Sequence, residues 1–265
     1  MFRSLLLLAL TGVSALSTAS AAGTIANDRP APPTVVLVHG AFADGASWDK
    51  VITILNQWGV QAVAVHNPLT SLGDDVATTR RAIDAAPGKV VLVGHSWGGT
   101  VITQAGIDDK VSALVYVAAF APDAGQNTGD QGRDFPAPPG LSHLLNRDGY
   151  LWLSDSTVAS DFAPDLKPRE QRLVFSTQAP IKATAFGDTV TQAAWRSKPS
   201  WYVIARNDRM IAPQLQVATA QRIGAQVRST SSSHVALLSQ PRDVAFAILE
   251  AAGVKADEAA PQDGG

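Results

Sequence analysis

The sequence has no cysteine at all and carries little charge. Without cysteine the chain can form no disulfide, no thiolate metal site and no lipid-modified cysteine. Lysine and arginine number 21 against 23 aspartates and glutamates, which gives a net charge of −2 with no basic stretch. A nucleic-acid partner is therefore not expected, because proteins that bind nucleic acids gather positive charge on one surface.

The chain also lacks an apolar run long enough to span a bilayer comfortably. The apolar run at 5–16 follows Arg3 and precedes small residues at 19–21, which is the pattern of a secretory signal peptide. We expect a signal peptide at 1–21, a linker at 22–33 and export to the periplasm or the medium. After cleavage no stable membrane insertion is expected.

Hydrophobic residues are abundant, at 46% of 265 residues, and this length suits one α/β domain. Short apolar runs alternate with helical patterns, which predicts a mostly parallel, doubly wound sheet with helices on both faces. The predicted strands cover residues 34–38, 60–65, 90–93, 111–119, 201–205 and 226–229.

The alternation stops at about 122–198, where proline, glycine and aspartate are frequent and only helical fragments occur. We expect a helical cap here, inserted after the strand that follows the serine motif described next. The domain then covers 34–254, and 255–265 is expected to be a flexible tail.

The most informative motif is Gly-His-Ser-Trp-Gly-Gly at 94–99, between an apolar strand and a helical run. A G-x-S-x-G sequence at a strand–turn–helix junction is typical of a nucleophile elbow. The turn strains the serine backbone, so its neighbours have to be small, as Gly94 and Gly98 are. Ser96 is therefore the predicted nucleophile.

A serine nucleophile needs a histidine base, and the base needs a carboxylate to orient it. Of the five histidines, only His234 lies between the last predicted strand and the closing helix. Asp208 follows the strand at 201–205 and is the predicted acid, because the acid comes before the base in this arrangement. Asp123, after the strand at 111–119, is the alternative acid.

Acyl transfer also needs hydrogen-bond donors for the developing oxyanion. One is the backbone N–H of Trp97, the residue after the nucleophile. We assign the second to the N–H of Ala41 in the loop after the first strand, with Phe42 as the alternative. Gly40 fits a backbone that turns its amides toward a ligand.

Four segments in chain order resemble the esterase and hydroxynitrile lyase branch of the α/β-hydrolases, which includes plant methyl-salicylate esterases. They are residues 36–42, 94–99, 208–213 and 233–241. The resemblance implies an α/β-hydrolase fold. In the lyases a threonine follows the histidine of the first strand and a lysine follows the catalytic histidine. Gly40 and Val235 stand at those positions here, so the resemblance favours ester hydrolysis.

We expect hydrolysis of small, largely apolar carboxylic esters through an acyl-enzyme, with no metal and no cofactor, by a monomer or homodimer. A lactonase, an amidase or a cofactor-free perhydrolase would use the same triad, and a hydroxynitrile lyase or an idle ligand-binding protein would share the fold. The residues expected to contact substrate are Gly40, Phe42, Phe120 and Trp152. Further aromatic residues that could line the pocket are Trp97, Phe135 and Phe162.

Overall fold

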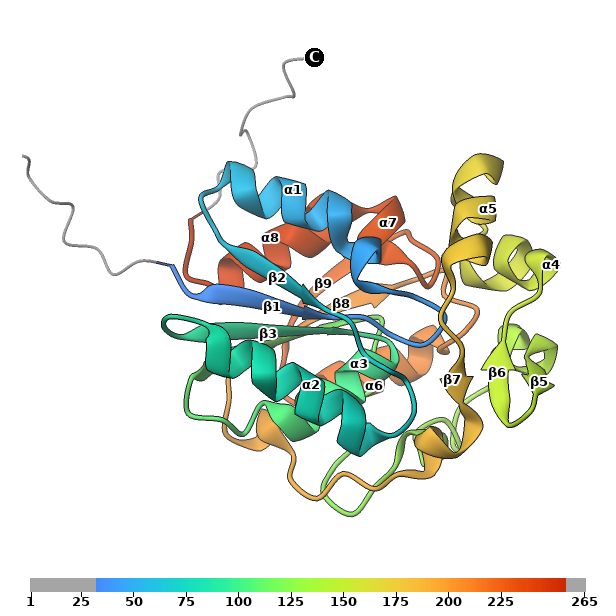
Figure 1. Cartoon of the computed structure of the whole chain (residues 1–265), viewed down its shortest axis with the longest axis horizontal. Coiled ribbons are helices and arrows are strands. Elements are labelled where there is room, and N and C mark those ends of the chain that lie inside the picture. The colour runs from blue at the N-terminus through green and yellow to red at the C-terminus, as the bar shows by residue number, and fades with distance from the viewer. Residues whose placement is uncertain (1–31, 256–265) are drawn as a thin grey trace, which may run out of the picture. The chain divides into compact units, whose positions relative to one another are not determined.

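Six parallel strands form the centre of the structure, a computed structural model that describes residues 32–255 (Figure 1). The strand order is β2-β1-β3-β4-β8-β9. The predicted signal peptide and most of the linker and tail lie outside the described residues. The strands are β1 (Thr34–Val38), β2 (Ala62–Val65), β3 (Val90–His95), β4 (Val111–Val117), β8 (Ser200–Ala205) and β9 (Gln226–Thr230).

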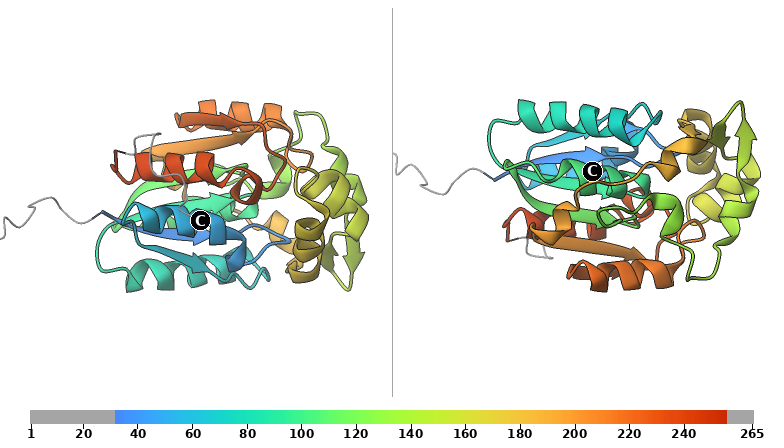
Figure 2. Two further views of the ribbon diagram at one scale, coloured as in Figure 1. Left: turned by 90° about the horizontal axis from the view of Figure 1, so that it is seen from above. Right: turned by 90° about the horizontal axis from the view of Figure 1, so that it is seen from below.

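Helices cover both faces of this sheet (Figures 1 and 2). Helices α1 (Asp49–Gln57) and α8 (Pro241–Ala251) pack together on one face. The other face carries α2 (Leu72–Ala85), α3 (Trp97–Ala105) and α6 (Pro213–Arg222). Strands β1 and β3 consist only of buried residues, as expected for parallel strands covered on both sides. The predicted α/β architecture is confirmed.

Most of the segment between β4 and β8 lies at the carboxyl ends of the strands (Figures 1 and 2), and the segment is called the cap below. The sequence predicts a helical cap, but the cap also contains a three-stranded antiparallel sheet. Its helices are α4 (Asp155–Thr157), a π-helical turn (Val158–Phe162) and α5 (Pro168–Thr177). Its strands are β5 (Leu145–Arg147), β6 (Tyr150–Trp152) and β7 (Ile181–Lys182).

The turn between β5 and β6 explains this difference. Asp148 and Gly149 have φ values of 51° and 81°, the left-handed pair that a two-residue hairpin needs. An Asp-Gly pair supplies that geometry at low cost, and it closes β5 onto β6 in antiparallel register.

Within residues 32–255, no helix has the length and apolar character needed to cross a bilayer.

Candidate active site

Ser96 lies at the sharp turn between β3 and α3, with φ 53° and ψ −120°. This positive φ is strained for a residue with a side chain, and it persists because the surroundings are closely packed. A Cβ on Gly94 would come within 2.4 Å of Gly98 O, and a Cβ on Gly98 within 2.4 Å of Val38 O. Glycine is therefore required on both sides of the serine. Ser96 is 7% exposed and lines a cavity.

The loops after β8 and β9 bring Asp208 and His234 together. His234 Nδ1 donates to Asp208 Oδ2 across 2.8 Å, and both side chains are buried. The proton on Nδ1 leaves Nε2 with a free lone pair, which is the tautomer a general base requires. The two residues come from neighbouring parallel strands, whose carboxyl ends meet at one edge of the sheet.

The Asp208 carboxylate is fixed by three further donors. Oδ1 accepts the backbone N–H groups of Met210 (2.7 Å) and Ile211 (3.0 Å). Oδ2 also accepts Gln216 Nε2 across 2.7 Å. Such a saturated carboxylate has one orientation. Sequence reasoning missed Gln216, because nothing in its local sequence indicates that a side chain of α6 reaches back to this loop.

Asp123, the alternative acid, lies elsewhere. Its carboxylate forms an ion pair with Arg196, whose Nε donates to Oδ1 across 2.7 Å. That hydrogen bond holds the pKa of Asp123 below its ordinary value. Of the two candidate acids, only Asp208 is hydrogen-bonded to His234.

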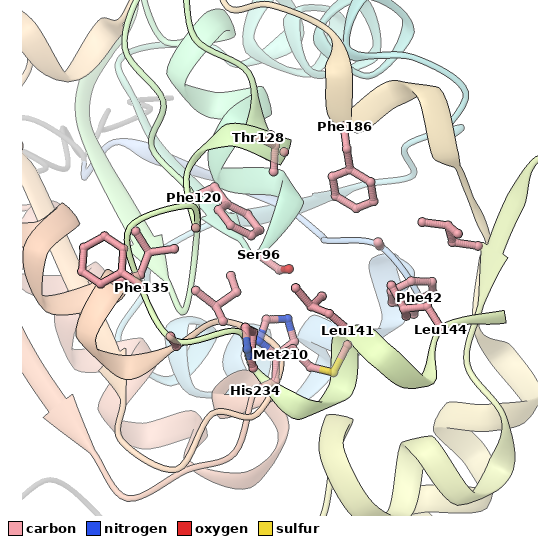
Figure 3. Close-up of a pocket in the computed structure, with 18 of the residues that line it drawn as sticks. Phe42, Ser96, Phe120, Thr128, Phe135, Leu141, Leu144, Phe186, Met210 and His234 are labelled. Atoms are coloured by element: carbon pink, nitrogen blue, oxygen red, sulfur yellow. The ribbon is translucent and has the colours of Figure 1, made fainter. Parts of the chain in front are cut away.

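Ser96 and His234 line the same cavity, and Figure 3 shows the serine hydroxyl directed into it with the histidine nearby. The hydrogen bonds found among residues 32–255 do not include one between these two side chains. In enzymes without substrate this bond is often long and shortens only when substrate binds. The structure therefore brings nucleophile and base to one cavity without joining them.

His95, at the end of β3, holds the loop that carries His234. Its Nε2–H donates to the backbone carbonyl of His234 across 2.9 Å. Burial holds the pKa of His95 well below its ordinary value, so the ring is neutral. The His234 ring contacts the rings of both His95 and Phe162, at centroid distances of 4.7 and 5.3 Å. Neither neighbour was assigned this role from the sequence.

His39 orients the loop after β1. Its Nε2 accepts the backbone N–H of Asn67 (3.0 Å), so Nδ1 carries the proton and donates to Gly40 O (2.9 Å). Burial lowers the pKa of His39, which keeps it neutral. Gly40 does not line the cavity, although it was expected to contact substrate. It is glycine because a Cβ there would come within 2.7 Å of Ser96 Cβ.

The two candidates for the second oxyanion donor differ in availability. The Phe42 N–H donates to Ala179 O in the cap across 3.0 Å, and Phe42 has a φ of 61°. For the N–H groups of Ala41 and Trp97, by contrast, the part of the chain that is described offers no acceptor. Ala41 also lines the cavity. The free donors beside Ser96 are therefore those of Ala41 and Trp97.

The Trp97 side chain does not line the cavity and is fully buried. Its indole N–H donates to Asp75 Oδ2 across 2.7 Å, while Asp75 Oδ1 accepts the backbone N–H of Leu69 (2.9 Å). Burial raises the pKa of Asp75 to about 6 despite these two donors. Asp75 on α2 thus anchors the residue that follows the nucleophile.

The cavity has a volume of about 300 Å³, and its lining is almost entirely apolar (Figure 3). None of the described residues that line it is charged, and the only polar side chains are those of Ser96, Thr128 and His234. The apolar side chains that line it are Ala41, Phe42, Phe120, Phe135, Pro136, Pro138, Leu141, Leu144, Leu151, Phe186, Met210, Ile211, Ala212 and Leu215.

Trp152 does not line this cavity, in contrast to the prediction. Successive residues of a strand point to opposite faces, and in β6 it is Leu151 that lies against the cavity. Phe162 is also outside the lining, because its ring packs against Phe42 and His234 instead. The register of the β5–β6 hairpin decides whether Leu151 or Trp152 faces the cavity.

No group of three or more His, Cys, Asp or Glu side chains in residues 32–255 is arranged to hold a metal ion. What the site offers is a hydroxyl at a strained turn, an imidazole oriented by a carboxylate, and two free backbone donors. These are the groups that acyl transfer uses.

The sequence matches a family model described as "Alpha/beta hydrolase family" over residues 35–248. An alpha/beta hydrolase of Aspergillus novofumigatus is 28% identical, covering 83% of this chain and 97% of that protein. Esterase PIR7B of rice, Oryza sativa subsp. japonica, is 27% identical, covering 82% and 94%. These matches confirm the resemblance that the sequence motifs indicate.

Among solved structures, that of polyneuridine aldehyde esterase superposes with a TM-score of 0.72 at 20% identity. The superposition covers 83% of this chain and 98% of the esterase. It confirms the predicted α/β-hydrolase fold.

Proposed function

We propose that this chain, which belongs to the alpha/beta hydrolase family, is a serine hydrolase that cleaves small, largely apolar carboxylic esters. The observation that carries the proposal is Ser96, held at a strained elbow and facing an uncharged cavity that His234 also lines. The hydrogen bond between His234 and Asp208 supports it. The relatives named as esterases support the bond type.

In the proposed mechanism, His234 Nε2 takes the hydroxyl proton as Ser96 Oγ attacks the ester carbonyl carbon. The N–H groups of Ala41 and Trp97 donate to the oxyanion of the tetrahedral intermediate. His234 then gives its proton to the leaving alcohol. Water, deprotonated by the same imidazole, hydrolyses the acyl-enzyme. Asp208 stays ionised and stabilises the imidazolium.

The cavity lining supports an uncharged substrate. A carboxylate or ammonium group entering it would lose its hydration without gaining a partner of opposite charge, which costs several kcal/mol. Aromatic and aliphatic surfaces such as Phe120, Phe135 and Leu141 favour an apolar acyl or alcohol group. At about 300 Å³ the cavity suits a small molecule.

A panel of p-nitrophenyl esters of increasing chain length tests the proposal. The native protein should hydrolyse uncharged esters, and Ser96→Ala and His234→Ala should each lower kcat by about 10³-fold or more. A lactone, an anilide and mandelonitrile complete the panel. Val235 stands where the lyases have a lysine, so cyanide release from mandelonitrile should be slower than ester hydrolysis. Faster cyanide release would overturn the assignment to ester cleavage. Unchanged turnover in Ser96→Ala would overturn the nucleophile.

A further inference from the structure

The loop that carries His234 runs from β9 to α7 (Ala236–Ser239) and is held from two sides. From the sheet, His95 donates to the His234 carbonyl. From the cap, the Asp165 carboxylate accepts two hydrogen bonds from Ser233, one from its N–H (2.8 Å) and one from its hydroxyl. Ser233 is buried, so the residue directly before the base is bound at both its backbone and its side chain.

The same cap segment contacts the base itself. Phe162 precedes Asp165 by three residues and places its ring against the His234 ring, at a centroid distance of 5.3 Å. The Phe162 carbonyl oxygen also lies 3.3 Å from the Ser233 hydroxyl oxygen, whose single proton goes to Asp165. One short stretch of the cap, residues 161–165, therefore meets both the base and the residue before it.

This stretch also reaches the loop that carries the acid. Asp161 Oδ1 accepts Arg209 Nε across 2.8 Å, and Arg209 directly follows Asp208. Burial acts to raise the pKa of Asp161, but hydrogen bonds from Ser160, His143 and Arg209 together hold it below its ordinary value. Two carboxylates of one cap segment thus bind the chain neighbours of two of the three proposed triad members, Asp208 and His234.

We propose that Asp165 is a positioning residue, which fixes the backbone that carries His234 by binding Ser233. The inference rests on the proposed function. It adds that the cap has to pack against the His234 loop for His234 to face Ser96. Hydrogen bonds to an ionised carboxylate are stronger and geometrically stricter than neutral ones. Because a misplacement of about 1 Å near reacting groups can cost about 100-fold in rate, a loosened loop lowers kcat.

Kinetics of Asp165→Ala test this on the full-length protein. We expect kcat to fall about tenfold with KM unchanged within twofold, because the cavity lining stays intact. Asp165→Asn should retain part of kcat, since its amide oxygen still accepts one of the two hydrogen bonds. Asp155→Ala is the matched control, because Asp155 is an exposed cap residue whose carboxylate accepts no hydrogen bond among the described residues.

A double-variant cycle separates positioning from a general loss of stability. If Asp165 acts through Ser233, the loss of kcat in the double variant Asp165→Ala with Ser233→Ala should be clearly smaller than the product of the two single losses. Losses that multiply, an unchanged kcat in Asp165→Ala, or a loss seen only in KM would each overturn the inference. A native protein that hydrolyses no ester would overturn the proposed function instead.

Hydrogen exchange supplies a readout that does not depend on activity. The peptide that contains residues 231–236 should exchange its amide hydrogens about tenfold faster in Asp165→Ala than in the native protein, because the Ser233 N–H loses its acceptor. Equal exchange rates in the two proteins would overturn the inference, whether or not the protein hydrolyses esters.

Discussion

Three histidines gather around Ser96, and their hydrogen bonds separate their roles. His39 uses one ring nitrogen to hold Gly40 and the other to accept Asn67 N–H. His95 donates to the base loop and lies outside the main cavity. Only His234 combines a carboxylate partner with a place in the cavity lining. At the scale of single residues, the hydrogen bonds of the three imidazole rings therefore favour His234 as the base.

The choice of acid gives the first prediction. Asp208→Asn should lower kcat/KM by about 10³- to 10⁴-fold, because the amide no longer stabilises the imidazolium or holds its tautomer. Asp123→Asn should change it less than twofold, since that carboxylate pairs with Arg196 away from the cavity. Steady-state kinetics on one uncharged ester compare the two variants. A large loss in Asp123→Asn alone would reverse the assignment.

Asp75 gives a prediction for stability against pH. Its folded-state pKa is about 6, compared with an ordinary value of 3.8. Between these values the folded state binds more protons than the unfolded state, so the free energy of unfolding falls as pH rises from about 4 to about 6. A difference of about two pKa units corresponds to about 3 kcal/mol. Asp75→Asn should remove this part of the pH dependence.

Urea unfolding between pH 4 and pH 7 measures the effect. As pH rises through this range, the unfolding free energy of the native protein should fall relative to that of Asp75→Asn. Asp74→Asn is the control on the same helix, because hydrogen bonds from Thr70 and Ser71 lower the pKa of Asp74 instead. Parallel stability curves for the native protein and Asp75→Asn would contradict the role given to burial.

The sequence allows Ser96, Asp208 and His234 to be named in advance, because each follows a predicted parallel strand and such strands end at one edge of a sheet. Their geometry is seen only in the structure. Gln216 and Asp165 could not be found this way, since each reaches the site from a distant element through tertiary packing. Strand order therefore predicts the proposed triad residues, whereas the residues that hold them in place depend on tertiary packing.

At the scale of elements, the elbow depends on the close approach of α3 to β1. Gly98→Ala should lower the free energy of unfolding by about 1–3 kcal/mol, because the new methyl group would meet Val38 O at 2.4 Å. This loss is expected although alanine is the better helix former. Gly88→Ala is the control, since a Cβ there meets nothing within 4 Å. Equal stability of the two variants would contradict the packing described for the elbow.

The cap shows where element prediction from sequence is weakest. Its strands β5, β6 and β7 have three, three and two residues, too few for an alternating pattern to be recognised. The Asp148–Gly149 pair is a usable hairpin signal, but the strands that it joins are too short to show the alternation that would confirm it. The misplacement of Trp152 follows from the same cause, because its direction depends on that hairpin.

At the scale of the whole molecule, the regular alternation of strands and helices made the architecture predictable, and the family match over residues 35–248 confirms it. Parallel strands buried on both faces have continuous apolar sequences that stand out without an alignment. The bounds of the predicted strands agree closely with the structure for β1, β8 and β9.

Export is a further proposal for the whole chain. The apolar run at 5–16 and the small residues at 19–21 predict cleavage after residue 21. Protein recovered from the periplasm or the medium should begin near Ala22 when its N-terminus is sequenced. An intact Met1 on the exported protein would contradict cleavage, and recovery from the cytoplasm alone would contradict export.

The most direct measurement of the central claim is the intact mass of the protein after treatment with a fluorophosphonate. The native protein should gain one adduct that maps to Ser96, because an activated serine attacks the phosphorus centre. Ser96→Ala should gain none, and His234→Ala should react far more slowly. The absence of an adduct on the native protein, or equal labelling of Ser96→Ala, would contradict the assignment of a serine nucleophile at the elbow.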